Sequence, residues 1–351
     1  MHSTVLDSSH QKELDRFVAT QAGSPIEQTW SWGELQTRLK GRPEFRAFAV
    51  VNEEGGEAKG AFLASLLVVR QEMGLGKTWL WAPRGPVLKA GLSGEESAEA
   101  WRLLLEACRN WARLHGDVFL RVEPGALPDD FTLGGAPSRD EYLPSHTLTL
   151  DLGLSEKALL EQMAQKGRYN IKIAEKAGVA VRRGEEADLA TFYAILGQTG
   201  ARDGFGVHPL SFYQDFLRIL GDAARLYVAD FDGRIVGGMI VTLFGDTATY
   251  YFGASSNEDR KVMAPYLLQW HAMCEAKKEG FKTYDFLGIA PDGGAGEGHA
   301  LAGVTQFKTR FGGTRVNTCG AHVFVYRWFW WTMRQLVKTL RRALMPKRST
   351  S

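Results

Sequence analysis

The stretch ARLYVADFDGRIVGGMIVTLFGDTATYYFGAS (residues 224–255) decides the fold. It holds three runs rich in β-branched and aromatic residues, with turn residues between them, and therefore predicts three strands. The next segment, APYLLQWHAMCEAKKEG (264–280), has helical periodicity and ends at a glycine. After it, FKTYDFLGIAP (281–291) predicts one more strand.

The same order of elements occurs once more, nearer the N-terminus. Three β-rich runs, a helix that ends at a glycine and a further strand are predicted at 46–51, 58–69, 77–87, 97–116 and 117–124. Agreement in the order and type of five elements indicates duplication of one supersecondary unit. Antiparallel strands followed by a helix and a further strand resemble the GNAT acyltransferase fold. We therefore predict an α/β (α+β) fold with two GNAT-like domains from an internal duplication.

The turns before the two helices bear on the acyl donor. GNAT enzymes hold the pyrophosphate of coenzyme A on a glycine-rich turn at the start of this helix, because free backbone amides there meet the phosphates. The corresponding turns here read GLSGEESAEAW (91–101) and SSNEDRKVMAPY (255–266). Neither has the glycine spacing, and the first is acidic. Coenzyme A is therefore disfavoured as the donor.

Composition narrows the class of protein. A length of 351 residues suits two domains, and 44% apolar with 23% charged residues is typical of globular proteins. Cys108, Cys274 and Cys319 form no CxxC pair, so we interpret them as reduced thiols and expect no metal site. The N-terminus lacks a signal-peptide pattern and the chain has no run of 18 apolar residues. We expect a cytoplasmic protein.

The C-terminal segment concentrates positive charge. From Ala321 onward there are seven basic and no acidic residues, so a net charge of +2 divides into a tail of +7 and a body of −5. On a helix, the basic residues from Arg327 to Arg342 lie opposite the apolar residues from Phe329 to Leu344. With three tryptophans at its start, this pattern is typical of a helix in a membrane interface. The alternative is a helix docked on the first domain with its basic face in water.

Eight stretches in order resemble the Fem aminoacyltransferases (FemA, FemB and FemX), which build peptidoglycan cross-bridges. They are QTWSWGEL (28–35), WLWAPRGPV (79–87), FLRVEP (119–124), KGRYNIKIAEKAGV (166–179), QTGARDGF (198–205), YYFGAS (250–255), YLLQWHAMCEAKKEGFKTYDFLGI (266–289) and FKTRFGG (307–313). The resemblance implies a first domain at 1–150, completed by 320–351, and a second at 151–319. The second domain has no room for the long helical hairpin of FemA-like members. Its layout is therefore closer to that of FemX-type members, which lack the hairpin.

The resemblance also implies a reaction. An aminoacyl group would pass from a charged tRNA to the stem-peptide amine of a UDP-linked or lipid-linked peptidoglycan precursor, with no cofactor. Peripheral contact with an anionic membrane at its inner face would fit this role. One alternative is a GNAT-type N-acyltransferase that uses acyl-CoA on another cell-envelope precursor. Another is a non-catalytic peripheral membrane protein that retains the fold.

Two residues are candidates for catalysis. In QFKTRFGG (306–313), Lys308 stands between two phenylalanines, Phe307 and Phe311, and would hold a localised charge in a poorly hydrated place. A fixed cation there would stabilise the oxyanion that forms when an amine attacks the ester, and the resemblance gives Lys308 this role. The alternative is a snorkelling lysine on a strand edge. Glu123 would orient the attacking amine, or form a salt bridge with Arg121.

Further residues are candidates for substrate binding: Phe307, Arg202, Arg84, Tyr251, Gln36, Trp32 and Thr199. Arg202 is the candidate clamp for a diphosphate, because a guanidinium fits phosphate oxygens, and a surface ion pair with Asp203 is the alternative. Arg84 lies in a stiff proline-flanked loop that it either holds or presents to substrate. Tyr251 would cover the sugar or peptide, or pack in the core.

One position departs from the family pattern. FemX-type members carry a phosphate-binding lysine shortly after WSWGE, where this chain has Gln36, with Lys40 nearby. A neutral amide grips a diphosphate more weakly, which argues against the UDP-linked acceptor. A basic helix is predicted after Ser155, with Lys166, Arg168, Lys172 and Lys176. It is either a solvated face or a contact for the phosphates of a nucleotide or an RNA.

Overall fold

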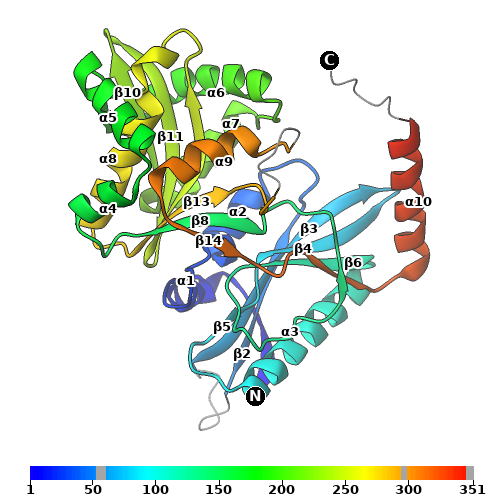
Figure 1. Cartoon of the computed structure of the whole chain (residues 1–351). Coiled ribbons are helices and arrows are strands. Elements are labelled where there is room, and N and C mark those ends of the chain that lie inside the picture. The colour runs from blue at the N-terminus through cyan, green and yellow to red at the C-terminus, as the bar shows by residue number, and fades with distance from the viewer. Residues whose placement is uncertain (53–60, 294–298, 345–351) are drawn as a thin grey trace.

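Two separate sheets carry the two copies of the repeated unit (Figure 1). The structure is a computed structural model that describes residues 1–52, 61–293 and 299–344. The first sheet has the order β1-β2-β3-β4-β6-β15-β7, and β5 pairs with β3. Its strands are β1 His2–Leu6, β2 Phe45–Val51, β3 Phe62–Gly74, β4 Lys77–Arg84, β5 Val87–Leu88, β6 Phe119–Pro124, β7 Ala136–Pro137 and β15 His322–Val325.

The second sheet has the order β14-β8-β13-β12-β11-β10-β9. Its strands are β8 His146–Asp151, β9 Ala180–Arg183, β10 Ala224–Phe231, β11 Arg234–Phe244, β12 Thr247–Ser255, β13 Thr283–Gly288 and β14 Thr314–Asn317. The chain thus crosses to the second sheet before His146 and returns to the first after Asn317.

The predicted repeat is confirmed element by element. The units β2-β3-β4-α3-β6 and β10-β11-β12-α8-β13 follow one another in the same order, with α3 at Gly94–His115 and α8 at Ala264–Lys278. In each unit the first three strands are antiparallel, and the strand after the helix pairs in parallel with the third. The helix makes this parallel pairing feasible, because it carries the chain back along the sheet.

Each repeat helix covers one face of its sheet. Helix α3 begins at a capping box between Ser93 and Glu96 and ends at Gly116, whose left-handed backbone closes the last turn. Its buried face, which includes Trp101, Leu104 and Cys108, packs with the apolar side chains of β2, β3, β4 and β6. The corresponding core of the second sheet includes Leu268 and Met273 of α8.

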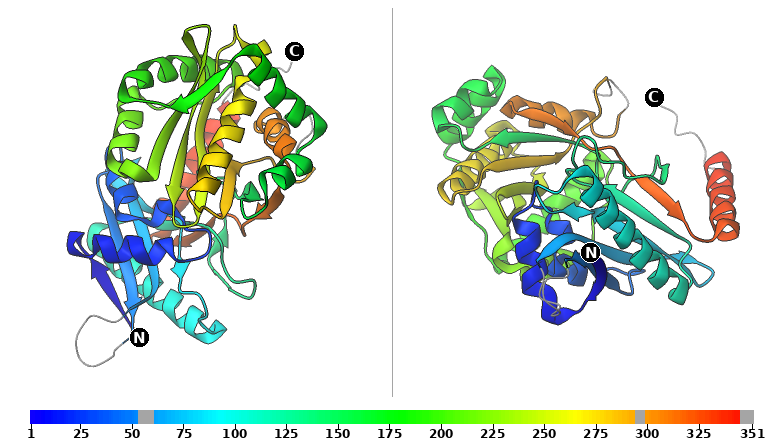
Figure 2. Two further views of the ribbon diagram at one scale, coloured as in Figure 1. Left: turned by 90° about the vertical axis from the view of Figure 1, so that its left-hand side faces the viewer. Right: turned by 90° about the horizontal axis from the view of Figure 1, so that it is seen from below.

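The remaining helices pack around the sheets and between them. They are α1 Gln11–Ala19, α2 Trp30–Gln36, α4 Glu156–Gln162, α5 Gln165–Ala177, α6 Leu189–Asp203, α7 Leu210–Leu220, α9 Ala302–Lys308 and α10 Trp328–Leu344. Short 3-10 turns include η2 (Ile26–Gln28) and η6 (Thr309–Phe311). Helix α2 of the first domain packs against α7 of the second, and Trp32 and Leu35 share one apolar cluster with Phe216. The two domains therefore meet along a buried seam (Figure 2).

The C-terminal helix α10 corrects only the alternative interpretation of the tail, and its contact with a membrane stays a prediction. It docks on the first sheet through Trp330, Trp331 and the basic side chains of Arg334 and Lys338, while its apolar side chains face outward. The predicted docked helix with its basic face in water is therefore wrong for these two cations. The side chains of Arg342 and Leu344, and the whole of Lys347 and Arg348, lie outside the described residues. No helix that the structure describes is long and apolar enough to cross a membrane.

Candidate active site

Lys308 is a buried cation at the end of α9. Its side chain is only 6% exposed, and its Nζ donates a hydrogen bond to the carbonyl oxygen of Gly288 at 2.7 Å. Nζ also lies 5.6 Å from the ring centroid of Tyr250. Burial lowers the pKa of Lys308 to about 8, and the negative charge of Asp285 opposes this shift. The poorly hydrated surroundings expected for Lys308 are present, and the strand-edge alternative is wrong because Lys308 ends a helix, while its catalytic role stays a prediction.

The aromatic neighbours of Lys308 hold its helix in place. Phe307 packs edge-on against Tyr266 of α8, and fully buried Phe311 stacks on the same ring. Gly312 and Gly313 have positive φ, and a Cβ on Gly313 would lie 2.4 Å from the carbonyl oxygen of Thr149. The two glycines therefore allow a close approach within the chain itself.

Asp285 is a site residue that the sequence reasoning missed. It lies on β13 and accepts hydrogen bonds from the hydroxyl of Thr147 and, at 2.7 Å, from the backbone amide of Leu287. Its charge acts on Lys308 and also on Tyr251. A polar residue inside the apolar strand TYDFLG was the available signal.

Tyr251 links the second sheet to the first domain. Its hydroxyl donates a hydrogen bond to the carboxylate of Glu27 in η2, and its ring lies 5.4 Å from that of Trp32. Burial raises the pKa of the Tyr251 hydroxyl well above its usual range, and the Glu27 carboxylate raises it further. The charges of Arg84 and Asp285 also act on this hydroxyl. Glu27, Arg84, Tyr251, Asp285 and Lys308 thus form a cluster of polar groups, which we call the seam cluster.

Arg84 and Glu123 both hold the segment that enters the second sheet. Arg84 ends β4 with a positive φ of 52° and donates a hydrogen bond to the carbonyl oxygen of Pro144 at 3.0 Å. The Glu123 carboxylate accepts hydrogen bonds from the backbone amides of Tyr142 and Leu143 at 2.9 and 2.8 Å. It also lies 3.8 Å from Arg121. Burial raises the pKa of Glu123, and the two amides oppose this. Glu123 therefore fixes the wall of the seam through backbone contacts.

Arg202 and Thr199 lie on α6. The Arg202 guanidinium donates two hydrogen bonds to the carboxylate of Asp203, at 2.7 and 2.9 Å, and a third to Asn257. The expected alternative, an ion pair with Asp203, is thus present. The buried hydroxyl of Thr199 donates to the Ile195 carbonyl oxygen and accepts from the amide of Ser255, which joins α6 to β12.

Gln36 holds a cation that the sequence reasoning missed. Its buried amide oxygen accepts a hydrogen bond from Arg42, whose guanidinium lies 5.4 Å from the ring centroid of Trp81. Burial lowers the pKa of Arg42. Burial lowers the pKa of His208, which precedes α7 in the second domain, and the charge of Arg42 lowers it further. A positive charge therefore lies beside Gln36 at the seam, supplied from six residues further along the chain. Lys40, the sequence candidate nearby, is exposed.

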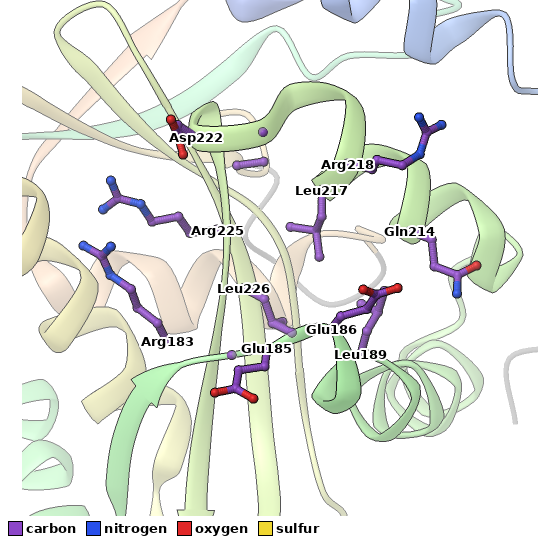
Figure 3. A pocket seen from close by; sticks show the side chains of 13 residues that line it. Arg183, Glu185, Glu186, Leu189, Gln214, Leu217, Arg218, Asp222, Arg225 and Leu226 are labelled. Carbon is purple, nitrogen blue, oxygen red and sulfur yellow. The ribbon is translucent and has the colours of Figure 1, made fainter.

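A cavity of about 490 Å³ lies elsewhere, between β9, β10, α6 and α7 (Figure 3). Its cations are occupied, because Arg183 and Arg225 both bind Glu279. Leu189, Leu217 and Leu226 supply its apolar lining. None of the seam cluster residues lines this cavity. Among the described residues, no group of three or more His, Cys, Asp or Glu side chains could hold a metal ion.

Comparisons with known proteins agree with this architecture. The family model of the acetyltransferase (GNAT) domain matches residues 162–309. The crystal structure of FemX superposes with a TM-score of 0.80 at 19% identity and covers 95% of this chain and 99% of that chain. A tandem GNAT protein from the clavulanic acid biosynthesis pathway superposes with a TM-score of 0.52 at 13% identity, over 92% and 98% of the two chains. The predicted fold of two GNAT-like domains is confirmed.

Sequence relatives point to the same group. The lipid II:glycine glycyltransferase of Staphylococcus aureus (strain COL) is 22% identical over 365 residues, which cover 80% of this chain and 84% of that protein. The same enzyme of Staphylococcus aureus (strain N315) aligns with the same identity and coverage. The chain is therefore similar to the lipid II:glycine glycyltransferases in sequence and to FemX in fold, and the resemblance to the Fem family that its motifs carry is confirmed.

Proposed function

We propose that this protein transfers an aminoacyl group from a charged tRNA to the stem-peptide amine of a peptidoglycan precursor. The relatives named as lipid II:glycine glycyltransferases support a transferase in cross-bridge synthesis, and they favour a lipid-linked acceptor. The observation that carries the proposal is the buried ammonium of Lys308, on which the charge of Asp285 acts. A buried cation costs free energy of folding, and such a cost is common at functional sites.

The chemistry needs little beyond positioning and one fixed charge. The neutral amine of the acceptor attacks the ester carbonyl carbon, so that a C–N bond forms and the carbonyl oxygen becomes an oxyanion. Lys308 stabilises this oxyanion more than the neutral ester. Collapse breaks the C–O bond to the terminal ribose, and the proton lost by the amine passes to the ribose oxygen. Tyr251 and Glu27 fix the opposite wall of the seam, and Glu123 and Arg84 fix the segment beside it.

Exposed cations provide contacts for the two substrates. Lys166, Lys172 and Lys176 project from α5 into solvent and would bind the phosphates of the tRNA. Arg168 differs from them, because it donates hydrogen bonds to carbonyl oxygens at the end of α4. Arg202 on α6 and Arg42 beside Gln36 would bind the diphosphate of the acceptor. Since charged tRNA is cytoplasmic and a lipid-linked acceptor is membrane-bound, we place the reaction at the inner face of the cell membrane.

The test is incubation with mixed aminoacyl-tRNA and either lipid-linked or UDP-linked pentapeptide, followed by mass spectrometry of the product. We expect a mass increase of one or more aminoacyl residues that ribonuclease abolishes. A third arm replaces the tRNA with acetyl-CoA. Ribonuclease-resistant acylation in that arm would overturn the proposal in favour of a coenzyme A-dependent acyltransferase.

A further inference from the structure

The outer face of α10 is an uncovered apolar surface. Trp328 and Phe329 are 69% and 68% exposed, and the apolar side chains of the next turns follow on the same side of the helix. Those are Met333, Leu336, Val337 and Leu340, which are between 41% and 53% exposed. A contiguous exposed face of this size marks an interaction site.

The inner face of α10 is already used. Trp330 and Trp331 are partly buried against the core of the first domain, and the Trp331 ring lies edge-on to Phe119 at 4.8 Å between centroids. The guanidinium of Arg334 lies 5.2 Å from the Phe119 ring centroid, and Lys338 pairs with Asp140. These contacts fix the orientation of the helix, so its apolar side faces away from the protein.

Two elements that contact α10 or the residue before it carry further exposed leucines. Leu75, at the tip of the β3-β4 hairpin, is 86% exposed, and Leu114, in the last turn of α3, is 83% exposed. Lys77 ties the hairpin to α10, because its Nζ lies 4.8 Å from the Trp330 ring centroid. The carbonyl oxygen of Val118, just after α3, accepts the backbone amide of Arg327. The tip of the β3-β4 hairpin and the end of α3 therefore lie at the end of the first domain where α10 stands, away from the second sheet (Figure 1).

Exposed arginines surround this edge. Arg109, Arg113 and Arg327 line a hollow of about 150 Å³, in which the buried Tyr326 hydroxyl has no hydrogen-bond partner in the described structure. Arg341 is exposed near the far end of α10. Among residues 1–52, 61–293 and 299–344, none of these four arginines forms an ion pair, whereas Asp117 in the hollow is paired with Arg70.

We propose that the outer face of α10, together with Leu75, forms a surface that inserts into the interface of a bilayer containing anionic lipids. Apolar and tryptophan side chains next to unpaired arginines match a layer in which acyl chains lie below phosphate groups. A second copy of this chain fits less well. Pairing two such surfaces would bring two sets of arginines together without a facing carboxylate. This inference deepens the proposed function, because a lipid-linked acceptor is presented at a bilayer.

The test is co-sedimentation of the full chain with vesicles of phosphatidylcholine alone or with phosphatidylglycerol added. We expect binding to the anionic vesicles that weakens as salt rises, since surface charges are screened over about 10 Å at 0.1 M. Changing Phe329→Gln, Leu336→Gln and Leu340→Gln together should lower vesicle binding by at least about 10-fold, because these side chains lose their gain from burial. The docked face is untouched, so the thermal unfolding midpoint should not fall.

A matched control changes three exposed apolar residues elsewhere, Val5→Gln, Leu154→Gln and Tyr169→Gln, and should bind vesicles like the parent. Absence of parent binding to anionic vesicles overturns the inference, and so does equal binding by the α10 variant. A parent dimer that the α10 variant converts to a monomer, without vesicle binding by either, assigns the surface to a second copy instead. Sedimentation needs no turnover, so it remains informative even if the proposed transfer reaction fails its own test.

Discussion

The hydroxyl of Tyr251 on β12 donates a hydrogen bond to the carboxylate of Glu27 in η2, so one side-chain pair joins the second sheet to the first domain. Both side chains are deeply placed, since Glu27 is 5% exposed and the Tyr251 ring packs on Trp32 and Phe216. A buried carboxylate that loses its partner carries a large desolvation cost. The pair therefore sets the relative position of the two walls of the seam.

Tyr251→Phe keeps the ring and removes the hydroxyl, and Glu27→Gln removes the charge. We predict that each change lowers kcat/KM by roughly 10-fold, because the walls that position the substrates lose their link. The double variant should be little worse than either single variant, since both changes break one interaction. Measured losses that multiply in the double variant would show that the two residues act independently.

The pH dependence of transfer tests the charge on Lys308. Its pKa is lowered to about 8 by burial, so the cation is present below pH 8 and lost above it. If the cation stabilises the oxyanion, this group contributes a decline in kcat as the pH rises through 8. Lys308→Arg keeps a charge at every accessible pH and should move that decline upward. A rise through pH 8 that is present in the parent and absent from the Lys308→Arg variant would instead identify Lys308 as a general base.

The Lys308→Met variant should have lower turnover but a more stable fold than the parent. We predict that turnover falls by about 10² or more, in line with the loss of one oxyanion donor. The protein should also become more stable at pH 7 by roughly 1–3 kcal/mol, because a desolvated cation is removed, although the Gly288 carbonyl oxygen loses its donor.

The stability difference has a defined pH window. Lys308 has a folded pKa of about 8 against its ordinary value of 10.5, so between these values the unfolded chain binds more protons than the folded one. This group therefore increases the free energy of unfolding of the parent as pH rises from 8 to 10.5. Thermal unfolding of parent and variant should converge over that range. A variant that is less stable than the parent at pH 7 would contradict the account.

Most of the fold could be predicted from the sequence, and the reason lies in the repeat. Alternating runs such as 224–230 and 234–244 and helices that end at Gly116 and Gly280 are local signals, and duplication gave each signal twice. The 302–308 segment was harder. Lys308 between aromatic residues suggested a strand, but contacts of Phe307 and Phe311 with Tyr266 of α8, far away in sequence, favour a helix there.

Candidate site residues could be named from the sequence only where a motif carried them. Glu27 and Asp285 are hydrogen-bonded to Tyr251 and Thr147, which lie 224 and 138 residues away in the sequence. No local sequence pattern links the members of these pairs. Arg42 is similar, because only the fold places its guanidinium on Gln36 and Trp81. For the tail, the helical wheel placed Arg334 correctly on the side opposite the apolar residues. It could not show which of the two sides contacts the protein.

Glu123→Gln distinguishes a positioning role from a direct role in catalysis. The carboxylate accepts hydrogen bonds from two backbone N–H groups. A glutamine side chain would point its own NH₂ donor at one of these N–H donors. We predict that unfolding becomes easier by roughly 1–3 kcal/mol, since a buried amide is left without an acceptor. The kcat should retain the same pH dependence as the parent. An unchanged unfolding midpoint with a flattened pH profile would instead assign Glu123 to proton transfer.

Substitutions of Arg202 and of Asp203 should change the KM of the phosphorylated acceptor in opposite directions. Asp203 now occupies the Arg202 guanidinium with two hydrogen bonds, and the two side chains are 26% and 47% exposed. A phosphate that binds Arg202 must therefore displace Asp203 or share the guanidinium with it. Arg202→Ala should raise the KM of the phosphorylated acceptor by roughly 10-fold, because a charge-assisted contact is lost. Asp203→Asn removes the competing carboxylate and should lower that KM. A stem peptide without phosphate supplies the control, because neither variant should change its KM. Equal increases of KM for both acceptors in the Arg202 variant would leave Arg202 as a surface partner of Asp203 alone.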